Sequence, residues 1–277
     1  MRHETGTFVA TGGIPLFTQA WLPEEEPKAG LVIVHGFGEH SGRYGNVVEF
    51  LVPRKYAIYT FDLRGHGRSP GPRGHVDRWD DYVEDVNAFL RHVRERLGPQ
   101  PLFLFGHSMG GLIALDYALR HPEGLNGVIA SGPVLAQPGV SPLLLMASRA
   151  LSKVLPRTTF DTHLDATALS RDPEVVRAYQ EDPLVHSLAT ARLGTELNNA
   201  IQRVHERASE WRLPLLILHG RADRLAPVEG SRAFIQNVPV EDKTLIEYPD
   251  GYHEPHNDIQ KAVVLRDLEK WLDVHIS

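Results

Sequence analysis

Pro101-Leu-Phe-Leu-Phe-Gly-His-Ser-Met-Gly-Gly-Leu112 is the stretch that decides the fold. Its apolar residues 102–105 predict a buried strand, and residues 112–120 are compatible with a helix. Between the two lies Ser108, with one glycine two residues before it and another two residues after it. A turn this sharp strains the backbone of the serine and leaves no room for side chains at the flanking positions. A G-x-S-x-G pattern between a strand and a helix predicts a nucleophilic serine.

The bulk composition is that of a globular protein and excludes several kinds of chemistry. The 277 residues suffice for one large α/β domain, or for one domain with an insertion. A formal net charge of -6 argues against a nucleic-acid partner or an anionic membrane bound by bulk electrostatics. The absence of cysteine excludes disulfides, zinc–thiolate sites and a cysteine nucleophile.

The N-terminal sequence and the hydropathy suggest where the protein is found. Residues 1–6 have no apolar core of the signal-peptide kind. No segment approaches the roughly 20 apolar residues that cross a bilayer. We therefore expect a cytoplasmic protein.

Strand and helix patterns alternate over most of the chain. Residues 8–10 and 14–22 flank Gly12-Gly13 and predict a hairpin. Further strands are predicted at residues 31–34, 56–61, 102–105, 127–130, 215–218 and 244–248. The short apolar runs among them are typical of parallel strands buried on both faces of a sheet. Helical patterns lie at residues 44–54, 77–97, 112–120, 227–237 and 257–274. This order predicts a mostly parallel central sheet with helices on both faces.

The alternation is interrupted in the middle of the chain. Residues 136–211 contain helical segments at 141–155, 173–179 and 184–207, and no convincing strand. We therefore interpret residues 1–135 and 212–277 as the two parts of one α/β core. Residues 136–211 are interpreted as a helical insertion.

A serine hydroxyl needs a base to remove its proton and a third group to orient that base. Doubly wound sheets carry such groups in loops at the carboxyl ends of their strands. His253 follows the strand predicted at 244–248 and is the expected base. Asp223 follows the strand at 215–218 and is the expected acid. Asp250 is the alternative acid, but it shares the loop of the histidine and is better explained as a turn residue.

The oxyanion that forms during attack needs preorganised hydrogen-bond donors. One expected donor is the backbone N–H of Met109, directly after the nucleophile. The other is the backbone N–H of Phe37, in the glycine-rich loop 35–38 after the predicted strand 31–34. His35 is expected to be structural, bonding within that loop.

Three long motifs carry a family resemblance. They are His-Gly-Phe-Gly-Glu-His-Ser-Gly-Arg-Tyr at 35–44, Asp-Leu-Arg-Gly-His-Gly-Arg-Ser at 62–69, and Gly-His-Ser-Met-Gly-Gly at 106–111. Shorter matches follow at 169–171, 182–184, 222–225 and 252–253. Together they resemble the monoacylglycerol lipase and lysophospholipase branch of the α/β-hydrolases over nearly the whole chain. The extension at 39–44 is the most specific part and resembles monoacylglycerol lipases of the animal type.

This resemblance implies an α/β-hydrolase fold, a serine hydrolase that cleaves carboxylic esters of lipids, and no cofactor. The most favoured substrate is a monoacylglycerol. The residues that match the family's head-group contacts are Glu39, Arg43, His256 and, less directly, Tyr179. The insertion resembles the family's cap, which lies over the acyl tunnel and touches membranes. Leu144 and Leu145 exceed what one apolar stripe of a cap helix needs and are candidates for lipid contact.

Several other interpretations compete with these assignments. Glu39 and Arg43 are four residues apart and could simply form a solvated pair at a helix start. The sequence His253-Glu-Pro-His256 is not a zinc-binding H-E-x-x-H motif, and its proline would disrupt the required helix, so we expect no metal. The same chemistry on a lysophospholipid, a small aromatic ester or an acyl thioester is the nearest alternative function. A non-enzymatic receptor on this fold is disfavoured because all three triad residues are present.

Overall fold

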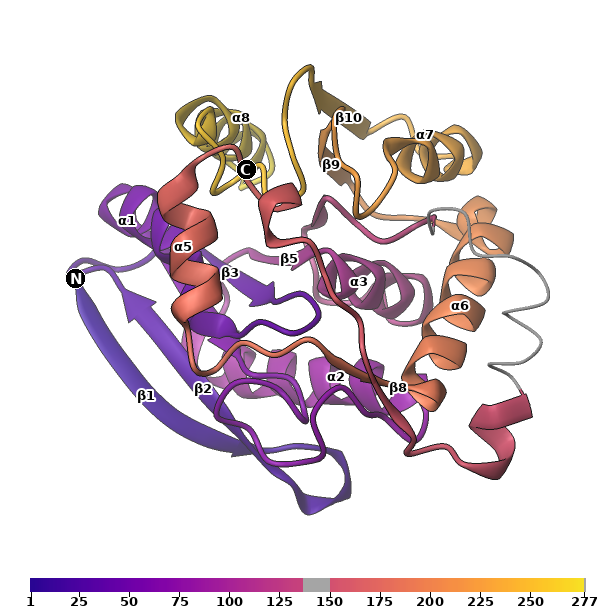
Figure 1. The fold of residues 1–277 in the computed structure, drawn as a ribbon. Helices are drawn as coiled ribbons and strands as arrows, with labels where there is room; N and C mark the ends of the chain where they lie inside the picture. The colour runs from indigo at the N-terminus through magenta and orange to yellow at the C-terminus, as the bar shows by residue number, and fades with distance from the viewer. Residues whose placement is uncertain (137–149, 277) are drawn as a thin grey trace.

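An eight-stranded sheet forms the centre of the computed structural model, which describes residues 1–136 and 150–276. The strand order is β1-β2-β4-β3-β5-β6-β9-β10 (Figure 1). The strands are β1 (Arg2–Val9), β2 (Pro15–Leu22), β3 (Ala29–Val34), β4 (Tyr56–Phe61), β5 (Leu102–His107), β6 (Gly127–Ser131), β9 (Leu215–Gly220) and β10 (Lys243–Tyr248). β2 is antiparallel to β1 and to β4, and every other neighbouring pair in this sheet is parallel.

The interior strands are buried on both faces because helices cover both. Every residue of β3, β4, β5 and β9 is buried, as their unbroken apolar runs predict. On one face the core includes apolar residues of α1 (Gly45–Leu51) and α8 (Lys261–Val274). On the other face it includes residues of α2 (Trp79–Leu97), α3 (Met109–Arg120) and α7 (Val228–Asn237). This architecture confirms the predicted fold class.

Several helix boundaries differ from their predicted positions by a few residues. α8 begins at Lys261 rather than at residue 257, because residues 257–260 form a turn whose side chains are tied to the histidine loop and to residues 170–171. α2 begins at Trp79 rather than at residue 77. The helix predicted at 44–54 is divided into α1 and a short 3-10 turn, Val52–Arg54. None of α1, α2 and α8 begins with a side-chain cap hydrogen bond, so no capping residue marks these boundaries in the sequence.

The middle of the chain contains a strand pair that its sequence pattern did not predict. β7 (Thr159–Asp161) pairs antiparallel with β8 (Leu188–Thr190). The same part of the chain contains α5 (Pro173–Glu181) and α6 (Ala191–Glu206). Strands of this length are too short to show an alternating pattern. The helix predicted from residue 184 begins only at Ala191, because the Thr190 side chain caps it by accepting the Leu193 N–H. Most of the helix predicted at 141–155, including Leu144 and Leu145, lies outside the described residues.

Residues 150–211 contact the rest of the chain at several places, of which two are well separated. The Arg203 side chain on α6 donates to the buried carboxylate of Asp116 on α3, with an Nη2–Oδ2 distance of 2.8 Å. Near β3, the His186 N–H donates to the Gly38 carbonyl at 2.8 Å. Among residues 1–136 and 150–276, no helix combines the length and the hydropathy needed to span a membrane.

Candidate active site

Ser108 stands at the apex of a close-packed turn between β5 and α3. Its backbone has φ 54° and ψ −119°, a strained conformation for a residue with a side chain. A Cβ at Gly106 would lie 2.2 Å from the Gly110 carbonyl oxygen, and a Cβ at Gly110 would lie 2.2 Å from the Val34 carbonyl oxygen. Both flanking positions therefore require glycine, and this close packing sets α3 directly against β5 and β3.

The structure brings Ser108, His253 and Asp223 together in one hydrogen-bonded line. His253 Nε2 lies 2.9 Å from Ser108 Oγ, and His253 Nδ1 lies 2.7 Å from Asp223 Oδ2. The other carboxylate oxygen of Asp223 accepts the backbone N–H groups of Leu225 and Ala226, at 2.8 and 2.9 Å. Because these amides hold one oxygen, the second oxygen is fixed towards the histidine. This is the arrangement in which an imidazole can take a proton from a serine hydroxyl.

Asp250, the alternative acid, lies elsewhere. It is exposed in the turn closed by the hydrogen bond from Gly251 N–H to the Tyr248 carbonyl. Asp223, in contrast, is only 8% exposed and is also 3.3 Å from Nε2 of the buried His219. The geometry thus favours Asp223 as the partner of His253.

Burial has opposite effects on the pKa values of Asp223 and His253. Burial alone would raise the pKa of Asp223, but the charge of His253 and hydrogen bonds from His219 and His253 outweigh it and hold the pKa well below its usual range. Burial alone would lower the pKa of His253, but the charge and hydrogen bond of Asp223 outweigh it and raise the pKa. Asp223 is therefore an anion at neutral pH, and His253 becomes a free base only as pH rises through its raised pKa.

The glycine-rich loop after β3 lies against Ser108. A Cβ placed on Gly36 would be 3.1 Å from Ser108 Cβ. Met109 is the first residue of α3, so its N–H has no partner within the helix. In the described part of the chain, the backbone N–H groups of Phe37 and Met109 donate to no protein acceptor. Two free amides beside a serine hydroxyl can bind a developing oxyanion. As expected, His35 bonds structurally, to the Gly36 carbonyl and the Leu63 N–H.

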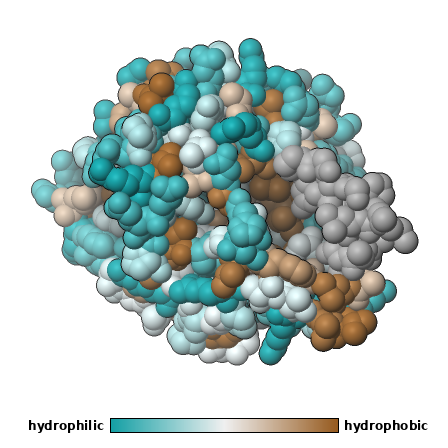
Figure 2. Space-filling view, viewed as in Figure 1, coloured by the Kyte–Doolittle hydropathy of each residue, from teal (hydrophilic) through white to brown (hydrophobic). Residues whose placement is uncertain are grey.

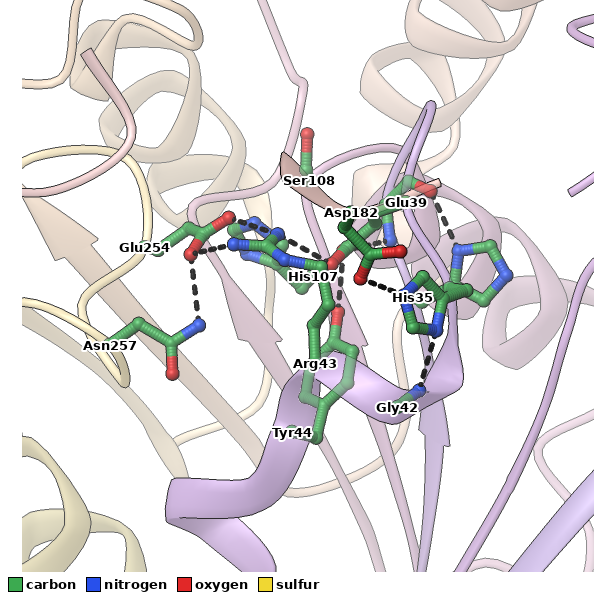
Figure 3. A network of polar contacts seen from close by, with 12 residues as sticks. His35, Glu39, Gly42, Arg43, Tyr44, His107, Ser108, Asp182, Glu254 and Asn257 are labelled. Carbon is green, nitrogen blue, oxygen red and sulfur yellow. Dashed lines mark hydrogen bonds and ion pairs between the residues drawn. The ribbon is translucent and has the colours of Figure 1, made fainter. Parts of the chain in front are cut away.

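A buried cluster of charged side chains lies beside Ser108 (Figure 3). Arg43 donates from Nη1 to Glu39 Oε2 at 2.9 Å, and it binds both carboxylate oxygens of Glu254, at 2.6 and 2.9 Å. Glu39 and Glu254 are 3% and 1% exposed. We call these three residues the Glu–Arg–Glu network. It excludes the interpretation of Glu39 and Arg43 as a solvated surface pair.

Each carboxylate of the network has further donors. Glu39 Oε1 accepts the Gly36 N–H at 2.6 Å and the Tyr44 hydroxyl at 2.8 Å. Glu254 Oε2 accepts the Asn257 side-chain amide at 2.9 Å. Burial alone would raise the pKa of Glu254, but the charge and hydrogen bonds of Arg43 outweigh it and hold that pKa far below its usual range. Glu254 is therefore a charged partner of Arg43 rather than a neutral acid.

Glu254 was missed by the sequence interpretation. It directly follows His253, and its sequence was weighed only as part of a metal motif. A carboxylate next to His253 gives no local periodic signal when the arginine that binds it lies 211 positions earlier in the chain. The structure alone pairs the two.

The remaining predicted head-group residues lie at different depths. The Tyr179 ring covers the guanidinium of Arg43, 4.7 Å from ring centroid to Cζ. A small cavity of about 30 Å³ is lined by Ser108, Tyr179, Glu39, Arg43, Glu254 and neighbouring residues. His256 is not among its lining residues: it is 1% exposed and stacks on the Tyr44 ring at 5.1 Å. We call the Glu–Arg–Glu network together with Tyr179 the polar wall of this cavity, and the structure places His256 behind this wall.

Sequence and structure comparisons agree with this geometry. Residues 25–260 match the family Hydrolase_4, described as serine aminopeptidase, S33. The chain is 38% identical over 272 residues to a monoacylglycerol lipase of Mycolicibacterium smegmatis, covering 98% of this chain and 97% of that protein. It is 34% identical over 274 residues to monoglyceride lipase of Rattus norvegicus, covering 97% and 90%. The crystal structure of Paleococcus ferrophilus monoacylglycerol lipase superposes with a TM-score of 0.83 at 35% identity, covering 99% and 100%. The chain therefore belongs to the Hydrolase_4 family of α/β-hydrolases and, within it, to the group of the monoacylglycerol lipases.

Proposed function

We propose that this protein hydrolyses monoacylglycerols to a fatty acid and glycerol through an acyl-enzyme. Ser108 Oγ attacks the ester carbonyl while His253 Nε2 takes the hydroxyl proton, and Asp223 orients and stabilises the imidazolium. The Phe37 and Met109 amides bind the oxyanion. Collapse of this intermediate breaks the bond to glycerol, which leaves with the proton from His253. A water molecule, deprotonated by His253, then attacks the acyl-enzyme and releases the fatty acid.

The observation that carries this proposal is the Ser108–His253–Asp223 line, with distances of 2.9 and 2.7 Å, in a chain whose monoacylglycerol lipase relatives match along nearly its whole length. Labelling by a fluorophosphonate probe tests the nucleophile. We expect the wild-type protein to be labelled and Ser108→Ala not to be. Release of glycerol from 1-oleoylglycerol by the wild type tests the substrate.

The charge of the polar wall supports a neutral leaving group. Two carboxylates, Glu39 and Glu254, face one guanidinium, that of Arg43, so the network carries a net negative charge. Arg43 is already bound to both carboxylates and offers little attraction to an added phosphate. A glycerol hydroxyl, in contrast, can donate to a carboxylate lone pair, since a carboxylate has about four acceptor positions.

We expect 1-oleoylglycerol to be hydrolysed much faster than 1-oleoylglycerol 3-phosphate, which differs only by its phosphate. A like charge close to the two buried carboxylates is destabilising by several kcal/mol, so the expected ratio of kcat/KM is about 10² or more. The measurement is a comparison of both substrates in the same detergent micelles. Equal rates on the two substrates would instead support the lysophospholipase interpretation.

We further propose that the residues 136–211 form a cap that contacts membranes peripherally. Support comes from apolar side chains that the described part of this segment exposes: Val154, Leu155, Phe160 and Leu188, at 77, 57, 48 and 38%. Figure 2 shows hydrophobic surface at the lower right, where this part of the chain lies in Figure 1. Burial of such side chains in lipid is favourable in proportion to the apolar area removed from water.

Replacing both Val154 and Leu155 by serine is expected to weaken binding to neutral phosphatidylcholine vesicles by about tenfold, since partial burial of two aliphatic side chains contributes about 1–2 kcal/mol. Hydrolysis of vesicle-borne monoacylglycerol should slow in parallel, with p-nitrophenyl butyrate hydrolysis unchanged. Val9→Ser is the matched control, because Val9 is 72% exposed on β1 outside the proposed cap. Unchanged vesicle binding in the double variant contradicts this contact.

A further inference from the structure

The Glu–Arg–Glu network joins the two loops that supply the proposed catalytic groups. At one end, Glu39 accepts the N–H of Gly36, the residue before the proposed oxyanion donor Phe37. At the other end, Glu254 directly follows His253 in the chain. Arg43 binds both carboxylates, so a continuous path of hydrogen bonds runs from the oxyanion loop to the histidine loop (Figure 3).

The three side chains of the network are buried, so the connection between the two loops is rigid. The side chains of Glu39, Arg43 and Glu254 are 4, 10 and 1% exposed. Charges removed from water remain stable only when their partners are well placed. Movement of either loop away from the other would leave a carboxylate or the guanidinium unpaired inside the protein. The network therefore fixes the position of the oxyanion loop relative to the histidine loop.

We propose that Glu254 is a positioning residue for ester hydrolysis: through Arg43 and Glu39 it fixes the oxyanion loop relative to His253 and Ser108. Its charge also favours the imidazolium that His253 becomes during attack. This inference rests on the proposed serine-hydrolase mechanism, but it does not depend on which alcohol leaves. It gives a function to a carboxylate that does not belong to the triad.

The charged and titratable groups around His253 come from several elements. Asp223 faces it from the loop after β9, His107 from the end of β5, Glu39 from the oxyanion loop, and Glu254 from its own loop. Glu254 and Glu39 act in the same direction as Asp223, because a negative charge near an imidazole stabilises its protonated form. Removing the charge of Glu254 should therefore lower the pKa of His253.

The test is Glu254→Gln, measured on p-nitrophenyl butyrate, a soluble ester without a glycerol group. We expect kcat to fall by up to about 100-fold, as for a small misplacement of reacting groups, with little change in KM. The acid limb of kcat/KM against pH should move to lower pH, because that limb reports the base of the free enzyme. Glu254→Asp, which keeps the charge, should recover part of kcat and return the acid limb towards the wild-type position.

Asp116→Asn is the matched control for a merely structural effect. Asp116 is a fully buried carboxylate that binds two arginines, Arg120 and Arg203, but it lies about two helical turns beyond Met109 on α3. Its loss should lower thermal stability while leaving the acid limb in place. The same fall in Tm in both variants, with a shifted limb only in Glu254→Gln, supports positioning.

Two results would overturn the inference. The first is unchanged kcat for Glu254→Gln on p-nitrophenyl butyrate; the second is an acid limb that does not move. If Glu254→Gln fails to fold, Arg43→Lys provides the same test, because lysine keeps the charge but loses the paired hydrogen bonds to Glu254. Unchanged kcat in Arg43→Lys would also contradict the inference. A wild-type protein inactive on every ester refutes the proposed function instead, so the two failures are distinguishable.

Discussion

Asp223→Asn is expected to lower kcat by about 10⁴-fold while KM changes little, the size of effect known for the acid of a serine-protease triad. The structure supplies the physical reason. The Leu225 and Ala226 amides both donate to one oxygen of Asp223, so an asparagine must place its carbonyl oxygen there. Its NH₂ group then faces His253 Nδ1. A donor at this position favours the imidazole tautomer that carries its proton on Nε2.

That tautomer cannot act as the base. With a proton already on Nε2, His253 would donate to Ser108 Oγ across the 2.9 Å contact instead of accepting its proton. The defect is therefore one of proton transfer and not of substrate binding.

The measurement is kcat and KM on a soluble ester, together with the rate of fluorophosphonate labelling. Asp250→Asn is the control, because Asp250 is an exposed carboxylate in the loop that contains His253. This variant should have near wild-type kcat and KM. If Asp223→Asn retained near-normal kcat and Asp250→Asn lost it, the acid of the triad would have to be reassigned to Asp250.

The core fold could be predicted from the sequence because its signals are local. Unbroken apolar runs such as β3 and β5 are buried on both faces, and the glycines around Ser108 are required by contacts of 2.2 Å that no side chain permits. The strands β7 and β8 were not predicted, because strands of three residues show no alternation and their pairing joins residues about 30 positions apart.

The polar wall illustrates the other limit of sequence interpretation. Glu39 and Arg43 were identified by resemblance to a family. What the Arg43 side chain binds, however, depends also on Glu254, which lies 211 positions later in the chain. His256 has the right sequence position for a head-group ligand but lies behind the wall, stacked on Tyr44. Sequence spacing places a residue in a loop; only the packing of that loop decides which side chain reaches the substrate.

The second large effect concerns the leaving group. We expect 1-oleoylglycerol to exceed methyl oleate in kcat/KM by roughly 10²-fold, since each hydrogen bond between a hydroxyl and a charged group contributes about 1.5–3 kcal/mol. The two esters share their acyl chain, so the difference reports the glycerol hydroxyls alone. A site whose polar groups depended wholly on the substrate would discriminate more strongly, by 10⁴ or more. Here Glu39 and Glu254 each keep protein donors, which limits the penalty when a hydroxyl is missing.

Tyr179→Phe is the variant that separates glycerol binding from catalysis. Tyr179 lines the cavity beside Ser108, and within the described residues its hydroxyl has no protein partner. Removing that hydroxyl should reduce the preference for the glyceryl ester several-fold and leave the rate on methyl oleate unchanged. Glu39→Ala cannot serve this purpose, because Glu39 also holds the Gly36 N–H of the oxyanion loop and its loss should slow every ester. If the wild type shows no preference for the glyceryl ester, the proposed monoacylglycerol specificity is wrong and only ester hydrolysis remains supported.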